Sequence, residues 1–144
     1  MKKRIKKYMV IIVAFAILFS VVNRNTTIHA YTEMISGDYF YSFYETSQYA
    51  QLSYYWGDKE NVSIPFEISG RIINGINSNT FVDNQKIKSV IIPNTVTSIE
   101  YKAFCNCSAL TNVTFSNNFA VINAFAFGDC TNLKSIIFQA VFIV

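Results

Sequence analysis

Histidine is almost absent from this chain of 144 residues, which contains only His29. Catalytic Ser–His and Cys–His pairs need an imidazole, so the residues after position 30 cannot form one. The nine acidic residues are spread out without an evident pair for acid–base chemistry. The five glycines form no loop that could cradle a phosphate. We therefore expect no catalytic residue, no cofactor and no enzymatic activity.

Cysteine is also scarce, with three copies at Cys105, Cys107 and Cys130. A structural zinc site needs four ligands, so we expect no metal site. Cys107 and Cys130 occupy equivalent places in two successive sequence repeats, which favours two small, buried and unbridged side chains. A disulfide between them is the alternative, because adjacent parallel strands lie about 4.8 Å apart and a bridge needs Cα atoms about 4.4–6.8 Å apart. The odd count leaves at least one thiol unpaired.

Positive charge is scarce outside the N-terminus. Six of the twelve basic residues lie in the first thirty positions and all nine acidic residues follow them, so residues 31–144 carry a formal charge of −3. A nucleic-acid-binding surface needs clustered lysine and arginine to neutralise phosphates. We therefore expect no nucleic-acid partner.

Residues 1–30 have the pattern of a secretory signal peptide, with a basic start at 1–7, an apolar run at 8–22 and a small residue, Ala30. Cleavage between Ala30 and Tyr31 would place the mature chain outside the cell or on its surface. The alternative is an uncleaved signal anchor, which would be the chain's only contact with a membrane. The apolar run of fifteen residues is shorter than the roughly 20 that a spanning helix needs, so we favour cleavage.

Residues 61–144 are built on a repeat of 23 residues. Two regular copies lie at 89–111 and 112–134, and they read SVIIPNTVTSIEYKAFCNCSALT and NVTFSNNFAVINAFAFGDCTNLK. An irregular copy with a five-residue insertion precedes them at 61–88, and a partial copy follows at 135–144. A fixed period of this length predicts a solenoid, in which each coil buries its apolar edge against the next. The identical positions of the regular copies are Val90/Val113, Asn94/Asn117, Ala103/Ala126, Phe104/Phe127, Cys107/Cys130 and Leu110/Leu133.

Within each unit, a strand and a turn can be recognised. Val113 and Phe115 are two residues apart, which is the period of a strand with one buried face. Phe127 and Cys130 are three apart, which places both on one face of a short helical turn. The phenylalanine would fill the coil interior, so Phe127→Ala should lower the free energy of unfolding by about 3–5 kcal/mol.

Residues 31–60 have a different composition and contain seven of the nine tyrosines. Aromatic side chains favour strands, so we predict a β-rich aromatic N-terminal cap that covers the first coil. An aromatic platform for a ligand is the alternative interpretation.

The repeat resembles the BspA-like leucine-rich repeats of bacterial surface proteins. The motif is Ile92-Pro93, Val96-x-x-Ile99, Ala103-Phe104-x-x-Cys107 and Leu110, and the likeness extends over residues 49–142. The departures are Ser116 and Gln139 where proline is usual and Asn84 at the cysteine position. The resemblance implies an α/β fold, a right-handed solenoid of short parallel strands with short helical turns. It also implies a secreted or surface-attached interaction protein, often an adhesin.

The outward strand positions are the natural binding face of a solenoid. They form a polar, mildly basic stripe that suits a protein or glycan ligand, such as one on a host or cell surface; a plain solvated face is the alternative. A structural fragment of a larger repeat protein, without separate activity, is the alternative function. The apolar residues 140–144 suggest self-association through an uncapped C-terminal edge. The predicted face comprises Lys88, Ser89, Ile91, Thr111, Asn112, Thr114, Lys134, Ser135 and Ile137.

Overall fold

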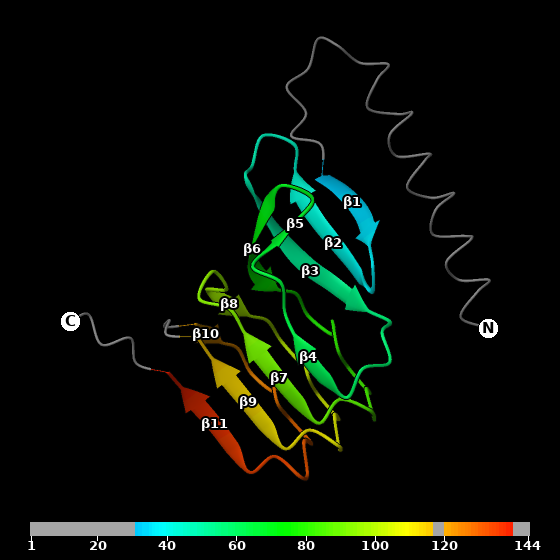
Figure 1. Ribbon diagram of the computed structural model, residues 1–144, viewed down its shortest axis with the longest axis vertical. Helices are drawn as coiled ribbons and strands as arrows, with labels where there is room; N and C mark the ends of the chain where they lie inside the picture. The colour runs from blue at the N-terminus through cyan, green and yellow to red at the C-terminus, as the bar shows by residue number, and fades with distance from the viewer. Residues whose placement is uncertain (1–30, 117–119, 140–144) are drawn as a thin grey trace.

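The computed structural model describes residues 31–116 and 120–139, which form two β-sheets and no helix. An antiparallel N-terminal region leads into stacked coils, and the first three of these coils contribute strands to both sheets (Figure 1). The predicted signal peptide, its cleavage site and residues 140–144 lie outside the described residues. The strands are β1 (Tyr31–Ser36), β2 (Tyr39–Tyr44), β3 (Tyr49–Tyr55), β4 (Asn61–Ser63), β5 (Glu67–Ile68), β6 (Arg71–Ile76), β7 (Ser89–Ile92), β8 (Ser98–Ile99), β9 (Asn112–Phe115), β10 (Val121–Ile122) and β11 (Ser135–Phe138).

The smaller sheet has four parallel strands in the order β11-β9-β7-β4, which lie side by side in Figure 1. Ser89 pairs with Asn112, and Asn112 pairs with Ser135, so neighbouring strands are offset by one period of the sequence repeat. Ser89 also pairs with Asn61 of the irregular copy, where the interval is five residues longer. The predicted stacking of parallel strands is therefore confirmed.

The larger sheet has seven strands in the order β1-β2-β3-β6-β8-β10, with β5 paired to β6. The insertion in the irregular copy forms the antiparallel β5–β6 hairpin, where Ile68 pairs with Arg71. Ser69 and Gly70 make its tight turn with φ angles of 52° and 78°, a region that glycine enters at little cost. The extra residues therefore lie in a surface hairpin, and the next coil stacks in register.

The described residues contain no helix, so the predicted short helical turns, and with them the α part of the α/β assignment, are not confirmed. In the coil at 89–111, Lys102 and Asn106 have positive φ angles of 56° and 57°, which interrupt a right-handed helix. Every second backbone N–H group of this turn bonds to the next coil, as when Phe104 donates to the carbonyl of Ala126 at 2.7 Å. A helix would use these donors within one coil. The backbone hydrogen bonds of this turn therefore hold neighbouring coils together.

A column of stacked aromatic rings runs through the interior. The ring of Phe81 lies 4.6 Å from that of Phe104, and Phe104 lies 5.1 Å from Phe127, with interplanar angles of 7° and 9°. Tyr55 of β3 extends the column, since its ring centroid is 5.1 Å from that of Phe81. The N-terminal region therefore packs on the first coil, through this ring and through the parallel pairing of β3 with β6. Its role as a separate cap stays a prediction.

In the part of the chain that the structure describes, no helix has the length and hydropathy needed to span a membrane. No group of three or more histidine, cysteine or acidic side chains in the same part could hold a metal ion.

Candidate binding face on the four-stranded sheet

Side chains alternate between the two faces of the four-stranded sheet. In β7, Val90 and Ile92 point into the core, whereas Ser89 and Ile91 lie on the outer surface. β9 repeats this pattern. All nine residues that were predicted to form the face are exposed or half-buried. The structure brings them together on β7, β9 and β11 and on the residue that precedes each of these strands.

The parallel register aligns these residues in three columns that cross the strands. The first column holds the residue before each strand, and backbone bonds join its members: Lys88 donates to the carbonyl of Glu60 at 2.6 Å, Thr111 to that of Lys88 at 2.8 Å, and Lys134 to that of Thr111 at 2.9 Å. The second column is Asn61, Ser89, Asn112 and Ser135, and the third is Ser63, Ile91, Thr114 and Ile137. We call these three columns the open face.

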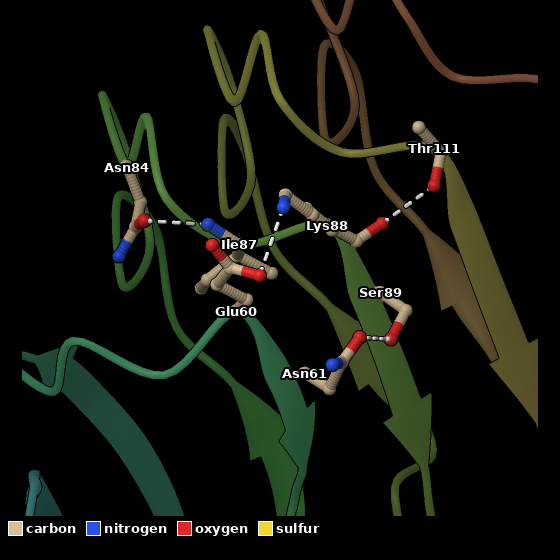
Figure 2. A network of polar contacts seen from close by, with 7 residues as sticks. All are labelled: Glu60, Asn61, Asn84, Ile87, Lys88, Ser89 and Thr111. Carbon is tan, nitrogen blue, oxygen red and sulfur yellow. Dashed lines mark hydrogen bonds and ion pairs between the residues drawn. The ribbon is translucent and has the colours of Figure 1, made fainter.

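The first strand of the open face was missed by sequence reasoning, although its residues contact the predicted ones (Figure 2). The Lys88 ammonium lies 2.8 Å from a carboxylate oxygen of Glu60. Ser89 donates its hydroxyl to the side-chain oxygen of Asn61 at 2.6 Å. The signal was present, because the alignment of Ile64 with Ile92 places Glu60 and Asn61 opposite Lys88 and Ser89.

The Glu60–Lys88 pair alters the charge of the open face. Two lysines gave the predicted stripe its basic character, and the carboxylate offsets one of them, which leaves Lys134 as the uncompensated charge. Hydroxyl and amide groups therefore dominate, flanked by the exposed Ile91 and Ile137. Such a surface can donate and accept hydrogen bonds and contact small apolar groups.

Hydrogen bonds between side chains and the backbone fix the end of the open face at which the strands begin (Figure 2). Asn84 stands where the regular copies have cysteine, and its side-chain oxygen accepts from the N–H groups of Lys86 at 3.0 Å and Ile87 at 3.1 Å. The Thr111 hydroxyl donates to the carbonyl of Lys88 at 2.9 Å. Asparagine commonly closes turns in this way. Asn84, which stands at the cysteine position of the repeat, therefore holds the turn that leads into β7.

A second line of polar side chains crosses the larger sheet and was not predicted. Asn77 donates to the hydroxyl of Ser53 at 3.1 Å, and the hydroxyls of Ser53 and Ser42 are 2.8 Å apart. Further along, Asn123 donates to the carboxylate of Glu100 at 2.6 Å. These groups are largely satisfied by one another, so we assign them to holding the coils together.

Stacked parallel coils with a buried aromatic column and one open polar face define a solenoid repeat protein. Residues 74–143 match the family described as BspA type leucine rich repeat region (6 copies). The repeat region of this chain belongs to the BspA-type leucine-rich repeat family. No curated protein sequence matches the chain.

Three crystal structures are similar to the chain. One is a leucine-rich cell surface protein from Faecalibacterium prausnitzii, with 26% identity and a TM-score of 0.63 over 74% of this chain and 32% of that one. Another is a leucine-rich repeat protein from Bacteroides capillosus, with 20% identity and a TM-score of 0.61 over 75% and 99%. The third is the T. pallidum leucine-rich repeat protein, with 20% identity and a TM-score of 0.60 over 75% and 54%. This chain spans about a third of the length of the first structure.

Proposed function

We propose that this chain is a secreted or cell-surface interaction protein, adhesin-like in function, whose open face binds a protein or a glycan. The observation that carries the proposal is the register of β4, β7, β9 and β11, which aligns outward side chains into continuous columns. A solenoid typically binds its partners on such a repeated surface. The similarity to a bacterial cell surface protein supports the location.

The composition of the open face supports the proposed ligand class. The open face offers hydroxyl and amide groups that can both donate and accept hydrogen bonds, on Ser63, Asn112 and Thr114. Ile91 and Ile137 add exposed apolar contacts on either side of Thr114. A face with little net charge does not favour a polyanion, whereas a glycan or a polar protein surface matches these groups. We include in the proposal an export signal at 1–30, an N-terminal cap at 31–60, a right-handed coil and the absence of catalysis.

A pair of matched substitutions tests the open face. Thr114→Arg places a long charged side chain in the middle of the face, and Thr97→Arg places the same side chain on an exposed position beside β8 of the other sheet. The full chain and both variants would be applied to a glycan microarray and to a panel of immobilised extracellular-matrix proteins. We expect saturable binding that Thr114→Arg weakens at least tenfold and Thr97→Arg leaves unchanged.

The comparison of the two variants decides the outcome. Equal binding by Thr114→Arg and Thr97→Arg would place the binding surface elsewhere. A folded chain that binds neither panel would contradict the proposal and favour the structural alternative, in which the coils are a part of a larger repeat protein without separate activity. Circular dichroism spectra of all three proteins show whether each variant keeps its sheets.

Self-association through the C-terminal coil is a second candidate role, favoured by the exposure of Phe138 on β11. Exposed apolar strand edges tend to pair with further chains. Sedimentation velocity over a range of concentrations would detect a dimer that Phe138→Asp abolishes. Phe66→Asp is the matched control, since Phe66 is equally exposed beside β5. A monomer at every concentration would contradict this role.

A further inference from the structure

The thiols of Cys107 and Cys130 lie on neighbouring turns that are held together by backbone bonds. Phe104 donates to the carbonyl of Ala126 at 2.7 Å, and Asn106 donates to that of Gly128 at 2.8 Å. These bonds fasten the turn before Cys107 to the turn before Cys130. Backbones paired in this way lie about 4.8 Å apart, inside the range of Cα separations, about 4.4–6.8 Å, that a disulfide spans.

The two cysteines also share one carbonyl group. The Cys130 thiol donates to the carbonyl oxygen of Phe104 at 3.1 Å, and the backbone N–H of Cys107 donates to that same oxygen at 3.4 Å. The Cys130 side chain therefore reaches back over the turn that carries Cys107. Both thiols are free in the structure.

We propose that Cys107 and Cys130 form an oxidisable dithiol, which a low-molecular-weight disulfide such as oxidised glutathione converts to a disulfide between successive coils. Bridging would draw Cys107 away from its own acceptor, the carbonyl of Phe81 at 3.1 Å. That carbonyl keeps the N–H of Asn84 at 3.2 Å, and the carbonyl of Phe104 keeps the N–H of Cys107. No buried acceptor is left without a donor, so the bridge avoids the cost of an unsatisfied carbonyl.

The environments of the two thiols assign the order of attack. Cys130 is half-buried and Cys107 is fully buried, so a small disulfide meets Cys130 first. The contact with Cys107 lowers the pKa of Cys130, against the opposing effects of burial and of the Asp129 charge. The same contact and burial raise the pKa of Cys107. Because the thiolate is the nucleophile, Cys130 attacks and Cys107 resolves.

The exchange balances in two steps. The Cys130 thiolate attacks one sulfur of oxidised glutathione, which forms a mixed disulfide and releases one glutathione thiolate. That thiolate takes the proton of Cys107, and the Cys107 sulfur then attacks the sulfur of Cys130 and displaces the second glutathione. Two protein thiols are oxidised, and one glutathione disulfide is reduced to two thiols.

The third thiol provides an internal control. Cys105 lies near the carboxylate of Asp129, with 4.0 Å between the sulfur and the oxygen, and it belongs to the same turn as Cys107. In an unfolded chain, Cys105 and Cys107 lie at nearly the same sequence distance from Cys130, so loop closure hardly distinguishes a Cys105–Cys130 bridge from a Cys107–Cys130 bridge. A bridge between Cys107 and Cys130 therefore reports the folded stack of coils.

The experiment equilibrates the full folded chain with mixtures of oxidised and reduced glutathione, then alkylates the remaining thiols and maps the peptides by mass spectrometry. We expect the three free thiols to fall to one, with a peptide pair that joins Cys107 to Cys130. Cys105→Ser should keep this bridge, and Cys130→Ser should lose it. The same treatment in urea should lose the preference for Cys107–Cys130.

Three results would overturn the proposal. Retention of three thiols in fully oxidised glutathione would show that the pair does not bridge. A stable glutathione adduct on Cys130 would show that Cys107 cannot resolve it. A bridge that contains Cys105 in the folded chain would show that the stacking does not select the pair. Each result is read on the unmodified chain, so none depends on whether a variant folds.

Discussion

Neighbouring coils of the solenoid carry the same motif, yet the structure buries them very differently. Val113 of β9 is 0% exposed and Phe115 is 2% exposed, whereas their counterparts on β11, Ile136 and Phe138, are 40% and 59% exposed. The residues have similar size and hydropathy. What differs is the number of neighbouring coils, because an inner coil is covered on both sides. In a solenoid the neighbours of a coil, more than its own sequence, decide how much each apolar side chain contributes.

The largest effect that would test this comparison is the loss of an inner aromatic ring. Phe104 lies between Phe81 and Phe127 and is fully buried, so Phe104→Ala should lower the free energy of unfolding by about 3–5 kcal/mol. Phe127 is only partly buried, so the cost predicted from the sequence is too high and Phe127→Ala should cost less than about 3 kcal/mol. Urea unfolding followed by circular dichroism measures both.

If Phe104→Ala is too unstable to measure, Phe104→Leu and Phe127→Leu give the same comparison with smaller losses. Equal costs at the two positions would mean that the outer coil is covered in solution. That result would agree with self-association through the C-terminal coil.

An aliphatic pair on the larger sheet gives a second, smaller difference. Ile99 of β8 pairs with Ile76 on one side and Ile122 of β10 on the other, and it is fully buried. We expect Ile99→Ala to cost about 2–5 kcal/mol of unfolding free energy. Ile122 is exposed, so Ile122→Ala should cost less than about 1 kcal/mol. Thermal melts that rank the two variants in the opposite order would contradict the assignment of inner and outer coils.

The repeated part of the fold could be predicted from the sequence because residues one period apart become neighbours in the stack of coils. Val90 and Val113 are one period apart in the sequence and are partners in the sheet. The turns could not be predicted in the same way. The Phe–Cys spacing fits a helical turn, but the N–H of Phe104 bonds to the next coil. Such a bond depends on Ala126, 22 residues further along the chain, which local spacing does not report.

The open face, too, could be predicted only in part from the sequence repeat. Six of the nine predicted residues lie on the two regular copies, where a period of two assigns the outward positions, and alignment with these copies places Lys88, Ser135 and Ile137. Glu60 and Asn61 were missed because they lie at the boundary where the irregular copy begins, and the insertion in that copy obscures the alignment. Their contacts with Lys88 and Ser89 depend on β4 pairing with β7. The surface charge of a solenoid is therefore best assigned after its irregular coils have been aligned.

Cys107 and Cys130 occupy equivalent positions in neighbouring coils, yet they differ in burial and in thiol pKa. The contact with Cys107 lowers the pKa of Cys130, so its thiolate should persist to a lower pH than that of an ordinary cysteine, whose pKa is about 8.5. We expect the rate of alkylation by iodoacetamide at Cys130 to reach half its maximum below that pH. In Cys107→Ser the weaker contact should move the profile to higher pH. An unchanged profile would mean that Cys107 does not set the pKa.

The smallest effect concerns the one ion pair of the open face. Both Lys88 and Glu60 have exposed side chains, at 56% and 59%, and water screens such pairs, so Lys88→Met should change the free energy of unfolding by less than about 1 kcal/mol. Lys86→Met is the matched control, since Lys86 is exposed two residues away and makes no ion pair among the described residues. The effect on Lys88 should vanish in 1 M salt, whereas a cost above about 1 kcal/mol that persists in salt would mean that its aliphatic stem packs on the coil. In that case Lys88 would stabilise the stack of coils through its aliphatic stem as well as pair with Glu60 on the open face.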